Sequence, residues 1–233
     1  MRPSPGSRTA VVGGRLANQV YDDLKQKLLA GEYAAGAPLV VAGICADYGV
    51  SKQPVMEAMR ALAADRLVEI QPQVGVRVRQ FDEGEVRAFF WLFARCEGAM
   101  AHRAAELRSD DELHRLEVLC DRMRRLEAAT AGDVNSPTYL KANREIHGLI
   151  HSMARSTLAA DISYDLWDLS DFLIATHGDG FAGRLSERNH GHDEVLQAIR
   201  DQNPEAAEAA MIEHVLSSPL GGGAPEIAEP AVS

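Results

Sequence analysis

The feature that most constrains the fold is a short run, GVSKQPVMEAMRAL, that begins at Gly49. A helix is expected just before it, over Val41–Tyr48, and Gly49 suits the left-handed conformation that often ends a helix. Ser51 can cap a second helix, and Pro54 is tolerated in its first turn. Two helices joined by so short a turn predict a helix-turn-helix.

The flanking sequence extends this motif on both sides. Apolar residues recur every four positions from Arg15 and predict a helix that Gly31 closes: Leu16, Val20, Leu24 and Leu28. Val55, Met59 and Leu62 form the expected inward face of the second helix of the motif. AAGAPL is expected to be a turn, and LVEI and VGVRV predict two short strands around a QPQ turn. Three helices followed by a two-stranded ribbon are the plan of a winged helix-turn-helix.

The rest of the chain shows no further strand pattern and predicts helices. Amphipathic segments occur at roughly 83–107, 109–130, 136–154, 158–177, 181–200 and 204–217. The fold class is therefore mainly α, with an N-terminal winged helix-turn-helix joined to an all-α helical bundle. The expected parts are a flexible tail (1–14), a winged helix-turn-helix (15–80), a helical domain (83–217) and a disordered tail (218–233).

Charge is distributed unevenly along the chain. Residues 1–80 hold ten Lys and Arg against seven Asp and Glu, about +3, which leaves −13 for the remainder of a chain whose net charge is −10. A mildly basic front on an acidic body indicates that one part faces a polyanion. Three scattered cysteines without a CxxC pattern, and no apolar run of membrane-spanning length, favour a reducing cytoplasm and no membrane association.

The residues between about 15 and 217 resemble a known family. The matching stretches are VYDDLKQKLLAGEYAAGAPL, YGVSKQPVMEAMRALAADRLVEI and GVRV in the front part, and NREIHGLI and HDEVLQAIRDQNPEAAEAAMIEH in the back part. They are similar to GntR-type transcription regulators of the FadR subfamily, which carry an FCD-type effector domain. The resemblance implies a homodimer that binds a short palindromic operator in double-stranded DNA and responds to a small metabolite.

The start of the second helix of the motif is expected to meet DNA. Lys52 and Gln53, after Ser51, can bond to phosphates or base edges, and a helix N-terminus favours phosphate. Arg77 and Arg79 on the expected wing could reach the DNA backbone, with ordinary surface charge as the equal alternative.

Two positions depart from the family pattern on this surface. Met56 and Ala42 stand where relatives usually have arginine. An arginine that pairs with guanine discriminates between bases by ~1–3 kcal/mol, and methionine cannot replace it. Met56 could touch a thymine methyl group or, as we favour, pack against apolar neighbours. The operator is therefore expected to differ from the common family sequence or to be bound more weakly.

The resemblance also implies a metal site. In the family, an aspartate and three histidines hold a divalent metal, and the matching positions here are Asn143, His147, His192 and His214. Asparagine replaces the commoner aspartate, so three neutral imidazoles and an amide leave the metal charge uncompensated, which favours an anionic effector. Zn²⁺ or Ni²⁺ suits imidazole ligands best. His147 and His151, four residues apart, are a weaker rival pair.

The effector is expected to be an organic acid, although one sequence feature opposes this. Family members commonly have arginine four residues before Glu97, where this chain has Phe93, and Arg95 is the nearest cation in sequence. Phe93 and Arg95 are the candidate effector-binding residues. The replacement favours an unusual or more apolar effector, and loss of effector binding stays an alternative.

The leading interpretation is a ligand-responsive transcription regulator, more often a repressor than an activator in this family. A helical interaction module with a decayed helix-turn-helix is the alternative that Met56 and Ala42 suggest. A small metal-dependent enzyme is a further alternative, but its nearest acids, Glu145 and Asp193, do not form an HExxH pattern. No catalytic residue is therefore assigned.

Overall fold

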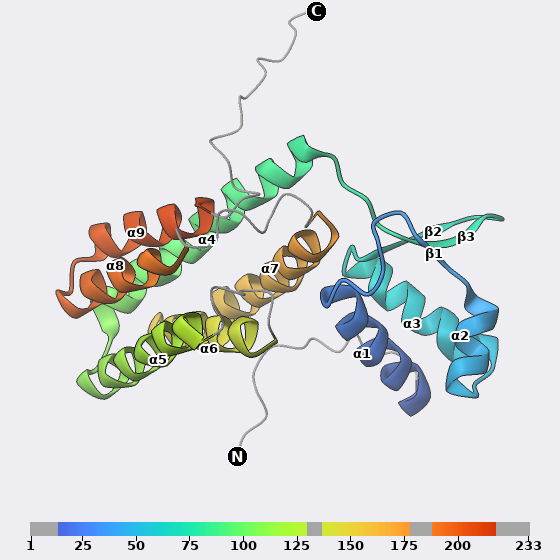
Figure 1. The fold of residues 1–233 in the computed structure, drawn as a ribbon, viewed down its shortest axis with the longest axis horizontal. Helices are drawn as coiled ribbons and strands as arrows, with labels where there is room; N and C mark the ends of the chain where they lie inside the picture. Colours follow the sequence, from blue (N-terminus) through green and yellow to red (C-terminus); the bar gives the residue numbers. More distant parts are fainter. Residues whose placement is uncertain (1–13, 130–136, 178–187, 218–233) are drawn as a thin grey trace, which may run out of the picture. The chain divides into compact units, whose positions relative to one another are not determined.

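The computed structural model describes residues 14–129, 137–177 and 188–217 (Figure 1). These residues form two compact units. The first contains residues 14–82 and 164–177, and the second contains residues 83–163 and 188–217, apart from the gap at 130–136. The tails expected at 1–14 and 218–233 lie outside the described residues. The one exception is Gly14, which is the N-cap residue of the first helix.

The first unit begins with three helices and a small sheet. Its elements, in chain order, are α1 (Arg15–Leu29), β1 (Pro38–Leu39), α2 (Val41–Tyr48), α3 (Lys52–Ala64), β2 (Val68–Gln71) and β3 (Gly75–Val78). The strands run antiparallel in the order β1-β3-β2. The winged helix-turn-helix predicted from the sequence is therefore present.

The expectation of a two-stranded ribbon was wrong by one strand. Pro38 and Leu39, expected to lie in a turn, pair with Arg77 and Val76 of β3. Two residues are too few to show the alternation by which strands are found in a sequence. Proline is tolerated here because it begins a strand at the edge of the sheet, where one N–H can be missing.

The core of this unit is formed by one face of α1 against α3. The predicted stripe is buried at Val20, Leu24 and Leu28 on α1, and α3 buries Val55, Met59 and Leu62 completely. Leu16 was wrongly expected to join the stripe, since it is 54% exposed and Ala17 is buried instead. A spacing of four drifts away from the helical repeat of 3.6, so the buried face moves by one position.

The turn before α3 has the predicted backbone but one contact is missing. Gly49 is left-handed, with φ of 62°, and ends α2. Ser51 is the N-cap residue of α3 in an extended conformation, yet its side chain makes no capping hydrogen bond. Ser51 is therefore the N-cap residue as predicted, but its side chain does not supply the capping hydrogen bond.

The described part of the second unit is helical and contains no strand. It holds α4 (Glu83–Leu107), α5 (Asp110–Ala129), α6 (Pro137–Met153), the first turns of α7 (Thr157–Thr176), α8 (Arg188–Arg200) and α9 (Pro204–Leu216). These bounds agree with the predicted segments to within a residue or two, and residues 181–187 lie outside the described part.

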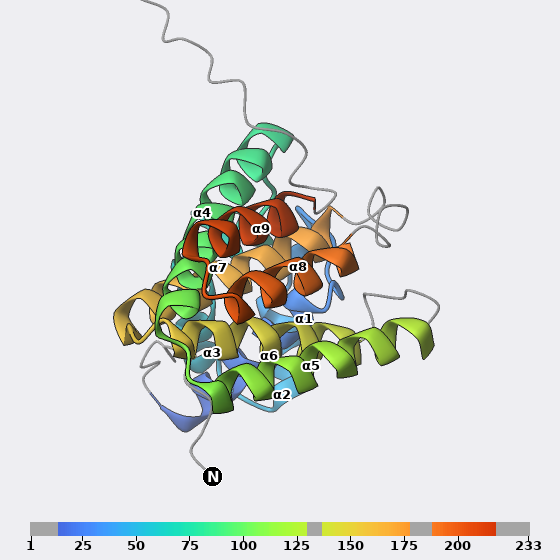
Figure 2. The ribbon, with the colours of Figure 1, turned by 90° about the vertical axis from the view of Figure 1, so that its left-hand side faces the viewer.

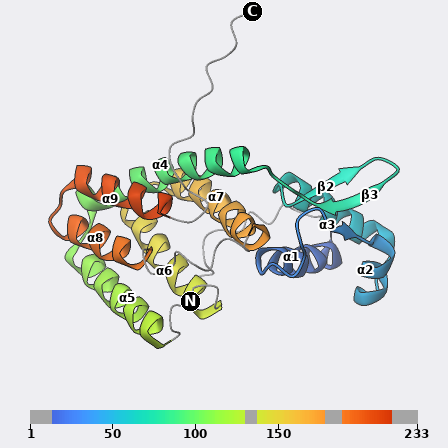
Figure 3. The ribbon, with the colours of Figure 1, turned by 45° about the horizontal axis from the view of Figure 1, so that its top comes forward.

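Helix packing in the second unit brings distant segments together. α9 lies along both α4 and α8 (Figure 3). α5 runs beside α6 (Figure 2) and also contacts α8. The α4–α9 approach is close at Gly98, where an added Cβ would lie 2.7 Å from the Ile212 side chain. The inward faces of α4, α6, α8 and α9 therefore meet in the interior of this unit.

The start of α5 carries a capping arrangement that predicts a pH dependence. Glu112 accepts hydrogen bonds from the N–H and hydroxyl of Ser109, each of 2.9 Å, and two from Arg155, each of 2.6 Å. The Arg155 hydrogen bonds hold the pKa of Glu112 at about 2, below its ordinary value of 4.5. Because the folded-state pKa is depressed, this stabilisation is present above pH 4.5 and is lost as the pH falls toward 2.

Glu112→Gln is therefore expected to lower the free energy of unfolding at pH 7 by about 1 kcal/mol, as loss of a cap usually does. The difference from the wild type should shrink as the pH falls below about 4.5. Urea unfolding of both proteins at pH 7 and pH 3 measures it, and an equal difference at both values would contradict an ionised Glu112 as the cause.

Candidate metal centre and nucleic-acid interface

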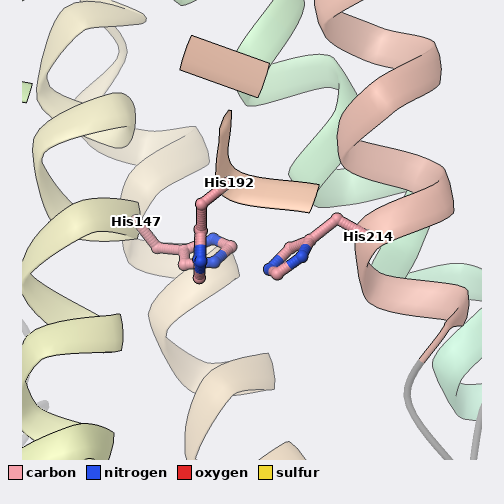
Figure 4. Close-up of side chains that lie close together, drawn as sticks. All are labelled: His147, His192 and His214. Atoms are coloured by element: carbon pink, nitrogen blue, oxygen red, sulfur yellow. The ribbon is translucent and has the colours of Figure 1, made fainter. Parts of the chain in front are cut away.

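Three histidines meet in the second unit. His147 lies on α6, His192 on α8 and His214 on α9, and one ring nitrogen from each falls within 4.8 Å of the others. All three side chains are buried, with 1%, 4% and 5% exposure. Figure 4 shows the three imidazoles turned toward one common point from three separate helices. The structure thus brings together three of the four metal ligands that the resemblance implies.

The rings face one another at different angles, as ligands around an ion do. The His192 and His214 ring centroids are 4.2 Å apart with an interplanar angle of 50°, and His147 is 5.5 Å from each. Imidazole nitrogen is a strong ligand for Zn²⁺, Ni²⁺ and Cu²⁺. Three imidazoles that are buried from solvent fit a divalent transition metal. The buried cluster could therefore bind a metal.

A glycine allows α8 to approach α9 at this point. A Cβ added at Gly191 would lie 2.4 Å from Nδ1 and 2.8 Å from Cβ of His214. Real Cβ atoms do not approach other heavy atoms so closely, so any larger residue forces His214 or the helix to move. Sequence reasoning missed Gly191, although it stands directly before the candidate ligand His192.

A buried carboxylate lies against the cluster. Glu97 of α4 is 0% exposed. Its Oε2 accepts a hydrogen bond of 2.7 Å from Nδ1 of His147, and its Oε1 accepts one of 2.9 Å from Nε2 of His151 and another from the Ser163 hydroxyl. Burial alone would raise the pKa of Glu97, but the two histidines hold it below its usual range. Two imidazoles and one hydroxyl thus surround the carboxylate.

Sequence reasoning used Glu97 only as a reference point and missed its contacts. His151, which with His147 formed the weaker rival pair, is buried and hydrogen-bonded to Glu97. Asn143, the fourth implied ligand, lies one turn before His147 on α6 and is 6% exposed. Its place on this face leaves it within the same interior, and its role as a ligand stays a prediction.

The two candidate effector residues have different surroundings. Phe93 is buried one turn before Glu97, stacked on Phe89 and edge-on to Phe90. Arg95 is exposed, with its guanidinium 5.3 Å from the centre of the Trp91 ring. The face of α4 that holds Glu97 is thus aromatic where relatives commonly have arginine.

The acids considered for an enzyme are engaged at the surface. Glu145 pairs with Arg122 at 2.7 Å, and Asp193 pairs with Arg124. Both side chains are about as exposed as their arginine partners, and both arginines lie on α5. An acid held in this way is poorly placed to take a proton from water at a buried metal.

In the first unit, one face of α3 is exposed. Lys52, Gln53 and Arg60 are exposed, and Met56 is half-buried between the core residues and this face. Gln53 donates a hydrogen bond of 3.1 Å to Glu57 one turn later. Arg60, which sequence reasoning did not select, continues the same face and adds a cation to it.

The two arginines expected on the wing make contacts within the protein. Arg77 lies on β3 and donates a 3.0 Å hydrogen bond to the carbonyl of Gly36. Arg79 follows the strand, and its guanidinium stacks 4.6 Å from the centre of the Phe81 ring. Each guanidinium keeps further N–H donors beside these contacts, and the role of both arginines in DNA binding stays a prediction.

The chain combines a winged helix-turn-helix, whose second helix is exposed, with an all-helical unit that contains a buried polar cluster. This combination defines a class of DNA-binding transcription regulators. The chain belongs to the GntR family of bacterial regulatory proteins, FadR-like subfamily. The model of that family matches residues 16–78, and the model of the FCD domain matches residues 88–217. The family consists of regulators, not enzymes. In the described residues, no helix combines the length and apolar character needed to cross a membrane.

Curated relatives match most of the chain at low identity. The HTH-type transcriptional repressor RspR of Escherichia coli is 26% identical over 201 residues, 84% of each chain. The probable D-xylose utilization operon transcriptional repressor of Paenarthrobacter nicotinovorans is 28% identical over 202 residues, 86% of this chain and 85% of its own. The galactonate operon transcriptional repressor of E. coli is 21% identical over 221 residues.

Two solved structures share the fold. E. coli McbR/YncC matches with a TM-score of 0.68 at 20% identity, covering 87% of this chain and 94% of that one. A GntR transcriptional regulator from Rhodococcus sp. RHA1 matches with a TM-score of 0.67 at 23% identity, covering 85% and 93%.

Proposed function

We propose that this chain is a cytoplasmic transcriptional repressor that binds a palindromic operator as a homodimer and releases it when a small organic acid binds beside a divalent metal in the FCD domain. Several relatives are named as repressors, including those for a D-xylose operon and a galactonate operon. The single observation that carries the metal-dependent part is the buried cluster of His147, His192 and His214.

In the proposed operator complex, the N-terminal end of α3 enters the major groove. Ser51, Lys52 and Gln53 lie there, where the N-terminal N–H groups of a helix also attract phosphate. Gln53 donates one N–H to Glu57 and keeps its second N–H and its carbonyl oxygen for a base edge. Met56 can offer bases only apolar contact. Two copies related by a two-fold axis would read two half-sites one helical turn or a multiple apart.

His147, His192 and His214 would hold the metal, with Asn143 as the fourth ligand, and Zn²⁺ or Ni²⁺ suits this donor set. A bound divalent ion supplies a positive charge and open coordination positions for an acid. Because Phe93 stands where relatives often have arginine, the carboxylate of the effector would depend on the metal for its attraction, while the phenylalanines of α4 favour an apolar remainder.

Release of DNA is proposed to be a population shift. The effector favours an arrangement of the two DNA-binding domains that does not fit the half-site spacing, and its effect is limited by its difference in affinity for the two arrangements.

The experiment that tests the proposed function is selection of bound sequences from a random DNA pool at a stated salt concentration. An enriched palindrome supports the regulator and gives the half-site spacing. Acids are then screened, with and without Zn²⁺ or Ni²⁺, for release of that operator. No enrichment with a folded, dimeric sample would overturn the proposal in favour of an interaction module.

Met56→Arg is expected to strengthen binding to a family-type operator by about 1–3 kcal/mol, because arginine can pair with guanine through two hydrogen bonds. Affinities of both proteins for the selected operator and for a family-type operator measure the change by fluorescence anisotropy. Met56→Lys is the matched control, since it adds the charge without the two-pronged geometry. If both variants gained the same affinity for both operators, the added charge alone would account for the effect, and pairing of arginine with guanine would be contradicted.

A further inference from the structure

Glu97 occupies an unusual position for a charged residue. It lies in the middle of α4 with 0% exposure, and side chains from α6 and α7 surround its carboxylate. A buried carboxylate is costly unless its oxygens are hydrogen-bonded. Here the hydrogen bonds come from groups on two other helices, α6 and α7. The carboxylate therefore links side chains that lie far apart in the sequence.

The two oxygens have separate partners. Oε2 faces Nδ1 of His147, and Oε1 faces Nε2 of His151 and the hydroxyl of Ser163. An ionised carboxylate only accepts hydrogen bonds, so the hydrogen of each contact belongs to the imidazole or the hydroxyl. In a neutral His147 ring, this places the proton on Nδ1 and makes Nε2 the nitrogen that can ligate a metal.

We propose that Glu97 is a positioning residue for the metal centre, acting through His147. It fixes the tautomer and the orientation of that imidazole, and it supplies a negative charge one hydrogen bond away from the ion. His151 and Ser163 hold the other oxygen, so that the carboxylate keeps its orientation toward His147. This inference rests on the proposed metal site and adds a residue that is not itself a ligand.

The charge balance of the donor set explains why this residue matters here. Three neutral imidazoles and the amide of Asn143 carry no negative charge, whereas a carboxylate in the position of Asn143 would supply one directly. Carboxylates hydrogen-bonded to a ligating histidine raise the basicity of the ring and orient it, and their removal typically costs 10–100-fold in metal affinity. Among the described residues, Glu97 is a buried carboxylate that contacts a histidine of the cluster.

The test compares the wild type with Glu97→Gln and Ser163→Ala. Affinity for Zn²⁺ and Ni²⁺ is measured by competition with a chromophoric chelator, and thermal unfolding of each metal-free protein shows whether it folds. Glu97→Gln is expected to lower the affinity about 10–100-fold. Ser163→Ala leaves the bond to His147 in place and should cost less than about tenfold, the range of one hydrogen bond.

A second readout does not depend on the stability of any variant. Long-range ¹H–¹⁵N spectra of the metal-free wild type report which nitrogen of His147 carries the proton. The expected result is a proton on Nδ1 and an unprotonated Nε2. A proton on Nε2 would overturn the proposal, and so would a folded Glu97→Gln protein that binds metal as tightly as the wild type.

The same measurements separate this inference from the proposed function. If the wild type binds neither Zn²⁺ nor Ni²⁺, the metal site itself is excluded and the positioning role with it. If the wild type binds metal and Glu97→Gln binds it equally well, the metal site stands and only the role of Glu97 is excluded.

Discussion

His192→Ala is expected to lower the affinity for Zn²⁺ or Ni²⁺ by about 100-fold or more. Removal of one of the three imidazoles takes a strong ligand from a buried site, and a structural zinc site draws about 10–16 kcal/mol from its whole ligand set. A share of about 3 kcal/mol for each ligand corresponds to more than two powers of ten. Isothermal titration calorimetry or chelator competition measures the loss.

The matched control for this substitution is His102→Ala. His102 lies on α4 of the same unit, where it contacts Glu208 at the surface with 30% of its side chain exposed. Its removal should leave metal affinity unchanged. An equal loss in both variants, or retained affinity in His192→Ala, would exclude the cluster as the binding site.

Gly191→Ala is expected to weaken metal binding about as strongly, without changing any ligand. The new methyl group would lie 2.4 Å from Nδ1 of His214, and two further side-chain atoms of that residue lie within 2.9 Å. Relief of the clash must displace His214 or separate α8 from α9, and overpacking of this kind costs about 1–3 kcal/mol of stability. Metal titration and thermal unfolding of the metal-free protein measure the two effects.

Gly43→Ala provides the control for helix propensity. Gly43 lies in α2, and a Cβ there would meet nothing within 4 Å. This variant should keep its metal affinity and gain stability slightly, since alanine favours a helix. Wild-type metal affinity in a folded Gly191→Ala protein would contradict the need for a close approach of α8 to α9 at the metal site.

Much of the fold follows from local patterns in the sequence. Gly49 needs a left-handed conformation and ends α2 as expected, and the apolar spacing of Val55, Met59 and Leu62 gives the buried face of α3. These inferences succeed because helix ends and helix faces depend on residues within one or two turns. β1 was not predicted because its pairing with β3 joins residues far apart in the chain.

The candidate site also has parts that could be predicted from the sequence and parts that could not. Its three histidines came from a family resemblance, since no spacing rule connects His147 with His192 and His214. The contacts of Glu97 with His147 and Ser163 span 50 and 66 residues. They depend on how α4, α6 and α7 cross, as the close approach at Gly191 depends on α8 and α9. Helix crossing is set by packing, which the sequence pattern does not give.

The position of the three histidines on three helices has a consequence for the lifetime of the protein. An ion held by His147, His192 and His214 is a cross-link between distant parts of the chain. An ion that binds only the folded state adds about 2.7 kcal/mol to stability when its concentration is 100 times its dissociation constant. Metal scarcity would then increase the unfolded fraction exposed to proteases. The amount of the regulator in the cell, as well as its response to an effector, would follow the supply of metal.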